Sequence, residues 1–409
     1  MRSGFIPIIL SAAIMSACAS DIENIPESDT YTVTEESTMT DTSTEKPSEC
    51  SEFTVPAEDK YVRILGRTTR SGDVLYTDYS LSGIEFEFEG TSCSIDITSD
   101  GERFGDERKA YAAVYYDDSD YPAHRFRLAD GTYSYKIFES DVPKNVKIRI
   151  EKLSEAPFAN MGIKNIHTVS YFAPSPAEEK PFKIQFIGDS ITCAYGIEGE
   201  DENSPFTTAE ENPHIGYAYL TAKHFGADYE LISQSGIGVV SCYTDIPGVR
   251  EDYVLMPDLY PYEDRNFDNA NNREPVKYVR RNKYPDIVVI NLGTNDYSYT
   301  ADIGRYTDEF GEGYYKLLEA VHEQNPDAAV ICTLGTLGNG LMPEIEKQAD
   351  RYRRNISENI YTLEFPLHDI VRDGSGARYH PSAETQKKDA ELLIAFIERE
   401  NILNGEDFT

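Results

Sequence analysis

The strongest constraint on the fold is a largely apolar run, Ile184 to Ile187, that stops at Gly188 and is followed at once by Asp189 and Ser190. The run predicts a buried strand, and the glycine permits a sharp turn. Ser190 is then expected at the carboxyl end of the strand, which is the edge where open α/β sheets bind ligands. Asp189 and Ser190 can also cap a following helix, and this stretch alone supports both interpretations equally.

Three later segments carry further chemistry-bearing residues. Residues 287–290 form a second apolar run that leads to Asn295, so Asn295 is expected at the same sheet edge as Ser190. Residues 229–233 predict a third strand, which breaks at closely spaced glycines and leaves backbone N–H groups near its end. His380 lies on a loop just before an amphipathic helix.

Together these segments resemble the four sequence blocks of the SGNH (GDSL-type) hydrolase superfamily, in the same order along the chain. The resemblance covers roughly residues 180 to 400 and rests on Gly188-Asp189-Ser190-Ile191, Gly238, Gly293-Thr294-Asn295-Asp296 and His380-Pro381. It implies a flavodoxin-like, three-layer α/β/α domain with a parallel sheet.

The resemblance also implies roles for individual residues. Ser190 is the expected nucleophile and His380 the expected general base. The backbone N–H of Ser190, Gly238 and the amide of Asn295 are the expected oxyanion hole. Gly236 is the alternative to Gly238, because the second block lacks its usual leading asparagine.

These residue types suit the chemistry independently of any family. A serine hydroxyl is a weak nucleophile unless a base lies within hydrogen-bond reach, and histidine fills that role near neutral pH. The tetrahedral intermediate needs donors aimed at its oxyanion. The nucleophile elbow of α/β-hydrolases, G-x-S-x-G, is excluded because Thr192 occupies the last position.

The family usually places an aspartate three residues before the catalytic histidine, and here that residue is Ala377. Two alternatives remain. Asp373 can act as the acid from further back in the loop, or a backbone carbonyl can orient the ring and leave a Ser–His dyad. We favour the dyad.

No histidine pair has the H-x-x-x-H spacing of a metal site, so we expect neither a metal nor another cofactor. His214 and His368 are the histidines least easily assigned to structure alone, but neither precedes a proline. The sparse cysteines are expected to be mostly free thiols, with a Cys193–Cys242 disulfide as the less favoured alternative.

Residues 1–19 are expected to be an export signal, because an apolar stretch from Phe5 to Ile14 is followed by small residues. The end of this segment resembles a bacterial lipoprotein signal, in which cleavage leaves Cys18 to carry lipid. Ordinary signal-peptidase cleavage after Ala19 is the alternative. We therefore expect an extracellular or surface-anchored protein that meets a membrane only through such a lipid.

The rest of the chain predicts a linker and two domains. Residues 20–57, rich in Ser, Thr and acidic side chains, predict a disordered linker. Short alternating runs over 58–172 predict an antiparallel β-sandwich of jelly-roll type. Strands alternating with helices over 180–405 predict the esterase domain.

A β-sandwich ahead of an SGNH domain resembles carbohydrate esterase family two, whose members deacetylate plant cell-wall polysaccharides. That family often has a tryptophan platform in its cleft, and this chain has no tryptophan. Tyr297 is the expected substitute, with Tyr195 and Tyr243 as weaker candidates.

A formal charge of −34 argues against nucleic acid and anionic lipid surfaces as partners. The resemblance implies a serine esterase that removes O-acetyl groups from xylan or glucomannan through an acyl-enzyme, and the expected state is a monomer. The alternatives are a lipid-directed esterase or lysophospholipase, and a non-catalytic carbohydrate-binding lipoprotein.

Overall fold

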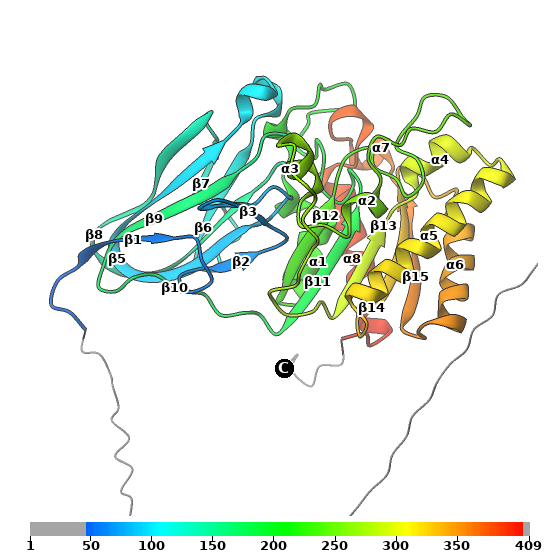
Figure 1. Cartoon of the computed structure of the whole chain (residues 1–409). Coiled ribbons are helices and arrows are strands. Elements are labelled where there is room, and N and C mark those ends of the chain that lie inside the picture. The colour runs from blue at the N-terminus through cyan, green and yellow to red at the C-terminus, as the bar shows by residue number, and fades with distance from the viewer. Residues whose placement is uncertain (1–45, 404–409) are drawn as a thin grey trace, which may run out of the picture. The chain divides into compact units, whose positions relative to one another are not determined.

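A computed structural model describes residues 46–403, which belong to one compact unit (Figure 1). The expected signal peptide 1–19, its Cys18 and most of the linker 20–57 lie outside the described residues. Within the described range, no helix is both long and apolar enough to cross a membrane.

The N-terminal part is an antiparallel sheet of ten strands, which confirms the predicted all-β domain. All ten are linked by hydrogen bonds into one curled sheet, in which β3-β4-β9-β5-β8-β6-β7 are successive neighbours and β1, β2 and β10 pair at its sides. The strands are β1 (Ser51–Pro56), β2 (Arg63–Leu65), β3 (Thr69–Ser71), β4 (Val74–Tyr76), β5 (Gly83–Ser99), β6 (Tyr111–Tyr116), β7 (His124–Arg127), β8 (Gly131–Lys152), β9 (Gly162–Ser170) and β10 (Ser175–Pro176).

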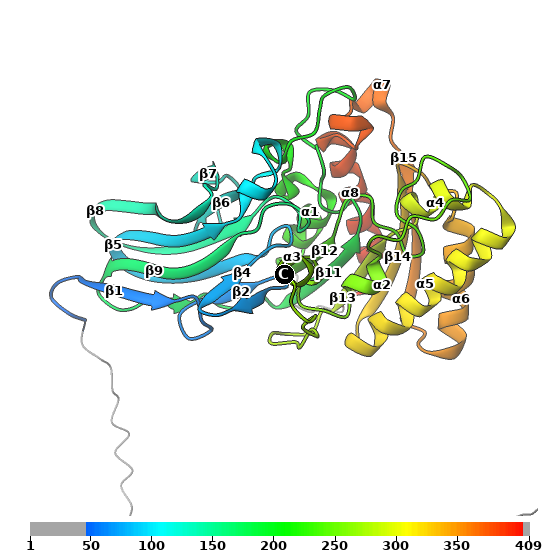
Figure 2. The ribbon, with the colours of Figure 1, turned by 45° about the horizontal axis from the view of Figure 1, so that its top comes forward.

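The curl comes from the long strands β5 and β8, which bend part-way along their length (Figures 1 and 2). Their pairing shifts register between Gly90 and Ser92. A Cβ at Gly90 would come within 2.2 Å of the carbonyl oxygen of Val169, so only glycine lets β9 approach here. Alternate residues of β5, such as Phe86 and Ile95, are fully buried in the apolar core inside the curl.

One boundary of the predicted linker is wrong. Residues 51–56 form β1, which pairs with β9 from Ser51 to Pro56. Phe53 and Val55 alternate with polar residues, and Val55 is buried in the core of the sheet domain. The Ser/Thr-rich composition of the preceding residues obscured this short period-two pattern.

The C-terminal part is a parallel five-stranded sheet in the order β12-β11-β13-β14-β15, the flavodoxin-like arrangement. Its strands are β11 (Phe182–Gly188), β12 (Ala227–Ser233), β13 (Ile287–Asn291), β14 (Ala329–Thr336) and β15 (Ile360–Leu367). The predicted α/β domain is therefore confirmed.

Helices cover both faces of this sheet (Figure 2). On one face α1 (Tyr217–His224) and α8 (Ala383–Arg399) pack on strand residues such as Phe186, and on the other α5 (Gly304–Gln324) and α6 (Met342–Asn355) pack on residues such as Ile187. Short helices lie in the connections that follow β12, β13 and β15: α2 (Met256–Leu259), α3 (Arg265–Ala270), α4 (Thr294–Thr300) and α7 (Ile370–Asp373).

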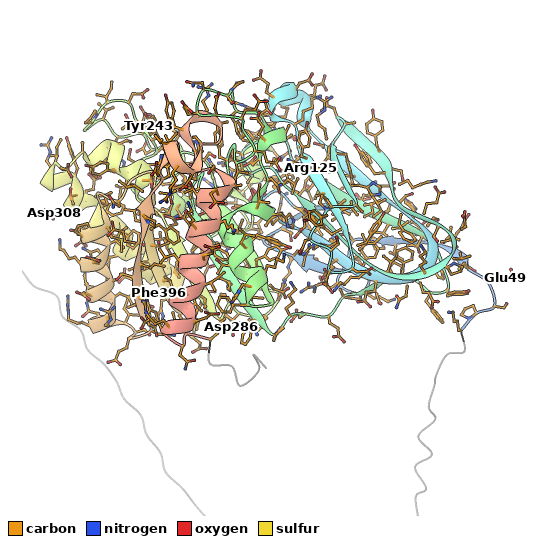
Figure 3. The ribbon with its side chains drawn as sticks, turned by 180° about the vertical axis from the view of Figure 1, so that it is seen from behind. Glu49, Arg125, Tyr243, Asp286, Asp308 and Phe396 are labelled. Atoms are coloured by element: carbon orange, nitrogen blue, oxygen red, sulfur yellow. The ribbon has the colours of Figure 1, made fainter. Side chains whose placement is uncertain are left out.

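Buried charges join the two domains. Arg67 of the sheet domain, 1% exposed, donates to the carbonyl oxygens of Tyr260 and Tyr262 and lies 3.5 Å from the fully buried Glu230 of β12. Burial favours the neutral form of Glu230, yet Lys183, Arg67 and Arg280 lower its pKa to about 2. On another edge of the contact, Arg125 of β7, labelled in Figure 3, pairs with Glu198 at 2.6 Å.

We expect Arg67→Ala to lower the free energy of unfolding by about 2 to 4 kcal/mol. The change removes the donor to the carbonyl oxygens of Tyr260 and Tyr262 and leaves Lys183 as the nearest cation to the buried Glu230. Urea unfolding measures this change. Arg351→Ala is the matched control, because its pair with Glu312 is partly exposed to solvent and should contribute little to stability. Equal losses in both variants would contradict the prediction.

Candidate active site

Ser190 lies directly beyond β11 in a tight turn and is 6% exposed. No helix begins at this serine in the described structure, since residues 190–198 form turns, so the helix-cap interpretation is wrong. A Cβ at Gly188 would come within 2.0 Å of Thr192 Oγ1, so the turn that presents Ser190 requires glycine before it.

Asn295 connects three loops at the carboxyl edge of the parallel sheet. It lies in the first turn of α4, directly after β13. Its Nδ2 donates to Asp189 Oδ2 at 3.2 Å and to the carbonyl oxygen of Ile237 at 2.8 Å. Asp189 also accepts from the N–H of Ile191 at 3.0 Å, and burial raises its pKa to about 7.

Gly238 lies on the loop after β12, where a side chain has no room. A Cβ here would come within 1.9 Å of the Ser241 carbonyl oxygen and 2.7 Å of Asp296 Oδ2. The Asp296 carboxylate accepts from the N–H groups of Val239, Val240 and Ser241, which fixes the loop beyond Gly238. Asp296 belongs to the block Gly293 to Asp296, but nothing in the local sequence indicates that its carboxylate holds a distant loop.

His380 lies at the end of a constrained loop. Its Nδ1 is 3.1 Å from the carbonyl oxygen of Arg378, and its own carbonyl oxygen accepts from the N–H of Gly376 at 2.9 Å. Arg378 and Tyr379 both have positive φ values, 55° and 63°, which side-chain-bearing residues rarely adopt. The loop thus accepts backbone strain where it turns a carbonyl toward the imidazole.

This geometry sets the properties of the imidazole. A proton on Nδ1 can be donated to the Arg378 carbonyl oxygen, which leaves Nε2 as the acceptor nitrogen. Burial lowers the pKa of His380 to about 4, although the Arg378 hydrogen bond acts in the opposite direction. His380 is therefore neutral at neutral pH, as a general base must be.

The structure does not bring Asp373 to His380. Its carboxylate pairs instead with Arg372 at 3.0 Å and Lys388 at 2.5 Å, and these cations lower its pKa to about 2. The alternative in which Asp373 acts as the acid is thus contradicted by its partners, because α7 ends at Asp373 and directs it toward α8.

The aromatic ring beside His380 belongs to Tyr195. The two rings lie 4.5 Å apart, and Tyr195 stacks on Phe206 at 3.6 Å. Tyr297 packs at the edge of the core, and its hydroxyl donates to Asp302. Tyr243 is 55% exposed on the loop after Gly238. A substrate contact by Tyr297 stays a prediction. The contact of Tyr195 with His380 depends on the geometry of the turn after Ser190, which the sequence does not reveal.

The remaining candidates are two histidines and the cysteines. His214 is buried and its Nε2 lies 2.8 Å from Glu151 of the sheet domain. Burial lowers the pKa of His368. The five cysteines among residues 46–403 are free thiols, so the predicted absence of a disulfide framework is confirmed there and the Cys193–Cys242 alternative is wrong.

Comparisons with known proteins match both domains. Residues 186–388 match the GDSL-like Lipase/Acylhydrolase family, and residues 64–176 match the carbohydrate esterase 2 N-terminal family. The chain is 28% identical to the acetylxylan esterase / glucomannan deacetylase of Cellvibrio japonicus, over 82% of this chain and 89% of that protein.

Two further relatives agree. The cellulase/esterase CelE of Acetivibrio thermocellus is 33% identical over 78% of this chain, which spans only 37% of that longer protein. The structure of a family two carbohydrate esterase from Clostridium thermocellum in complex with cellohexaose superposes with a TM-score of 0.71 at 28% identity, covering 83% of this chain and 99% of that one. With both domains matched in the expected order, this chain belongs to the GDSL-type (SGNH) hydrolases, as a carbohydrate esterase of family two.

Proposed function

We propose that the protein is a secreted or surface-anchored serine esterase that removes O-acetyl groups from plant cell-wall xylan or glucomannan. The observation that carries this proposal is the pairing of His380 Nδ1 with the Arg378 carbonyl oxygen, at the sheet edge that also holds Ser190 and Asn295. The names of the relatives support the substrate class. Export and a lipid on Cys18 rest on the sequence alone.

In the proposed reaction, Ser190 Oγ attacks the acetyl carbonyl carbon while His380 Nε2 takes the hydroxyl proton. The oxyanion is held by the N–H groups of Ser190 and Gly238 and by Asn295. The C–O bond to the sugar then breaks, and the sugar oxygen takes the proton from His380. Water, deprotonated by His380, attacks the acetyl-serine, and acetate leaves as Ser190 regains its proton.

Two features of the resting site bear on this mechanism. The Arg378 carbonyl fixes the tautomer of His380 but stabilises the imidazolium less than a carboxylate would, so the catalytic unit is a dyad. Both Nδ2 hydrogens of Asn295 have partners, so binding of the oxyanion exchanges one of them. We assign this exchange to the longer hydrogen bond, at 3.2 Å to Asp189.

We expect the mature protein to release acetate from acetylated xylan or glucomannan and Ser190→Ala to release none above background. Acetate is measured directly, with acetylated pectin as a third substrate. Its anionic backbone makes pectin a poorer fit to a chain of charge −34. No release from any of the three polysaccharides would contradict the proposal, and faster cleavage of long-chain p-nitrophenyl esters than of the acetate would favour the lipid-directed alternative.

We expect Asp373→Ala to keep kcat within about threefold of the wild type, because Asp373 pairs with Arg372 and Lys388 rather than with the imidazole. His380→Ala is the comparison and should lower kcat by about 10² to 10⁴, the usual contribution of a general base. Both are measured on p-nitrophenyl acetate. A collapse of activity in Asp373→Ala would contradict the dyad.

We expect kcat/KM to stay level from neutral pH down to about pH 5 and to fall below it, because only neutral His380 accepts the serine proton and its pKa is lowered to about 4. The acid limb should therefore lie below the ordinary histidine value of about 6.5. Initial rates of acetate release between pH 4 and 8 give the profile. A midpoint at or above 6.5 would show that burial does not set this pKa.

A further inference from the structure

Glu155 of the N-terminal part reaches across to the loop after β12. It follows β8, and it is fully buried. Its Oε2 accepts from the N–H of Ser235 at 2.5 Å, and its Oε1 accepts from the Ser235 hydroxyl at 2.6 Å. A single carboxylate thus satisfies both donors of one residue that lies 80 positions further along the chain.

Ser235 begins the stretch that leads through Gly236 to Gly238, the proposed oxyanion-hole loop. The far end of this loop is fixed by Asp296, and its middle by the hydrogen bond from Asn295 to the Ile237 carbonyl oxygen. At the near end, the backbone contact to β11 is long, 3.4 Å from the N–H of Gln234 to the Gly188 carbonyl oxygen. The N–H of Tyr243 donates to the Gly236 carbonyl oxygen at 2.9 Å, and Asn266 donates to the Gln234 side chain at 2.9 Å. The two bonds to Glu155 are the shortest of the contacts at this end and the ones that hold Ser235 itself.

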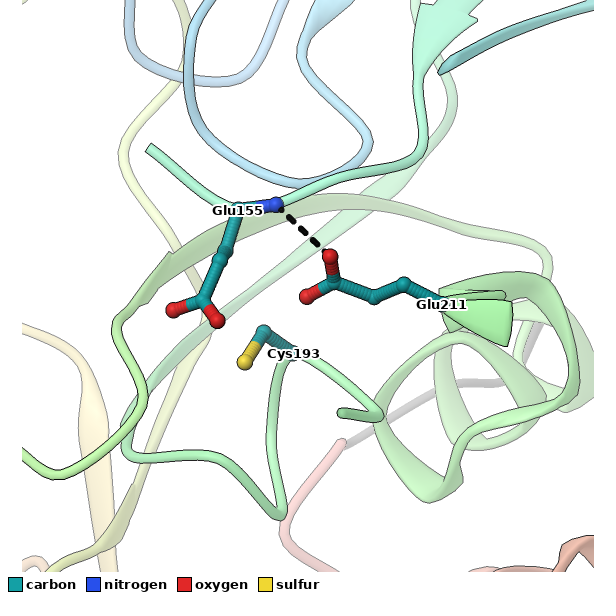
Figure 4. Close-up of side chains that lie close together, drawn as sticks. All are labelled: Glu155, Cys193 and Glu211. Carbon is teal, nitrogen blue, oxygen red and sulfur yellow. Dashed lines mark hydrogen bonds between the residues drawn. The ribbon is translucent and has the colours of Figure 1, made fainter. Parts of the chain in front are cut away.

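Glu155 is itself held in place. The Nζ of the buried Lys152 donates to the carbonyl oxygens of Asp78, Ser154 and Glu155, at 2.8 to 2.9 Å. The N–H of Glu155 donates to Glu211 Oε2 at 3.2 Å, which Figure 4 shows as a dashed line. The backbone of Glu155 is thus held on both sides, by Lys152 and by Glu211, and this fixes the position from which its carboxylate contacts Ser235.

The thiol of Cys193 lies in the same cluster, with one atom each of Glu155, Cys193 and Glu211 all within 4.8 Å of one another (Figure 4). This spacing alone would suit a cation. Both oxygens of Glu155 already accept hydrogen bonds, however, and Lys152 brings a positive charge to the cluster. Burial and the neighbouring Glu155 raise the pKa of Glu211 well above its usual range, which disfavours a second negative charge in the cluster.

We propose that Glu155 is a positioning residue through which the N-terminal domain fixes the oxyanion-hole loop of the esterase domain. This inference rests on the proposed function, because it assigns the loop after β12 to the oxyanion hole. The N-terminal domain is then part of the active site rather than a separable module. Small displacements of reacting groups are costly, at about a hundredfold in rate for 1 Å.

The test is Glu155→Gln, in which one oxygen becomes an NH₂ group and can no longer accept from Ser235. We expect kcat on p-nitrophenyl acetate to fall about ten- to a hundredfold, with KM within about twofold, because the oxyanion forms only after substrate binds. Ser235→Ala removes one of the two bonds with less risk to folding and should lower kcat in the same direction. In the Ser235→Ala background, Glu155→Gln should cost less than it does alone.

Glu151→Gln is the matched control. Glu151 is also buried in the sheet domain and also crosses to the other domain, where it contacts Tyr229 and His214, but it does not touch the loop. We expect Glu151→Gln to lower the melting temperature and leave kcat unchanged. Wild-type kcat in both Glu155→Gln and Ser235→Ala, or equal kcat losses in Glu155→Gln and Glu151→Gln, would overturn the inference while the wild type stays active. An inactive wild type would overturn the proposed function as well.

Discussion

The active-site edge of the parallel sheet depends on buried carboxylates that satisfy loop N–H groups. Asp189, Asp296 and Glu155 accept from the backbone of the turn after β11 and from the two ends of the loop after β12. Buried loops otherwise carry unpaired donors, each costly in free energy. Burial raises the pKa of all three carboxyl groups, to about 7 for Asp189 and about 6 for Asp296. The site is thus rigid because these buried carboxyl groups accept the hydrogen bonds of the loop N–H groups around it.

The general base, His380, is positioned by a backbone carbonyl oxygen rather than by a carboxylate. Where a neighbouring carboxylate would orient the imidazole, this chain uses a backbone carbonyl, and it accepts two consecutive residues of positive φ, Arg378 and Tyr379, to place it. A carbonyl carries no full charge, so it does little to offset the burial of the ring, and the pKa of His380 stays low. A low pKa keeps the base neutral over a wide pH range but makes it a weaker proton acceptor. Because the base is weaker, catalysis depends more on accurate placement of the oxyanion-hole loop.

Much of this arrangement could be predicted from local patterns. The apolar runs before Gly188 and Asn295 identify central strands, and parallel strands bring their carboxyl ends to one edge. The alternation in residues 84–88 and 146–150 likewise identifies antiparallel strands. The predictions that were wrong concern contacts between residues far apart in the sequence, or a strand whose pattern was hidden by the composition around it. Asp373 is near His380 in sequence but pairs with Lys388 on α8, and β1 was hidden at the end of a Ser/Thr-rich stretch. The contact of Glu155 with Ser235 joins two domains and leaves no local pattern.

The domain contact explains why the two parts belong together. Arg67 and Glu151 from the sheet domain each meet buried partners on the esterase domain, and Glu155 does the same at the active site. A buried charge without its partner costs several kcal/mol, so a cut between the domains would leave several such groups unpaired or exposed at once. The contact between the two domains therefore supports both the stability of the protein and the geometry of the oxyanion-hole loop. A substitution that loosens this contact is expected to lower kcat more strongly the nearer it lies to Ser235, and to lower stability most where it leaves a buried charge without a partner.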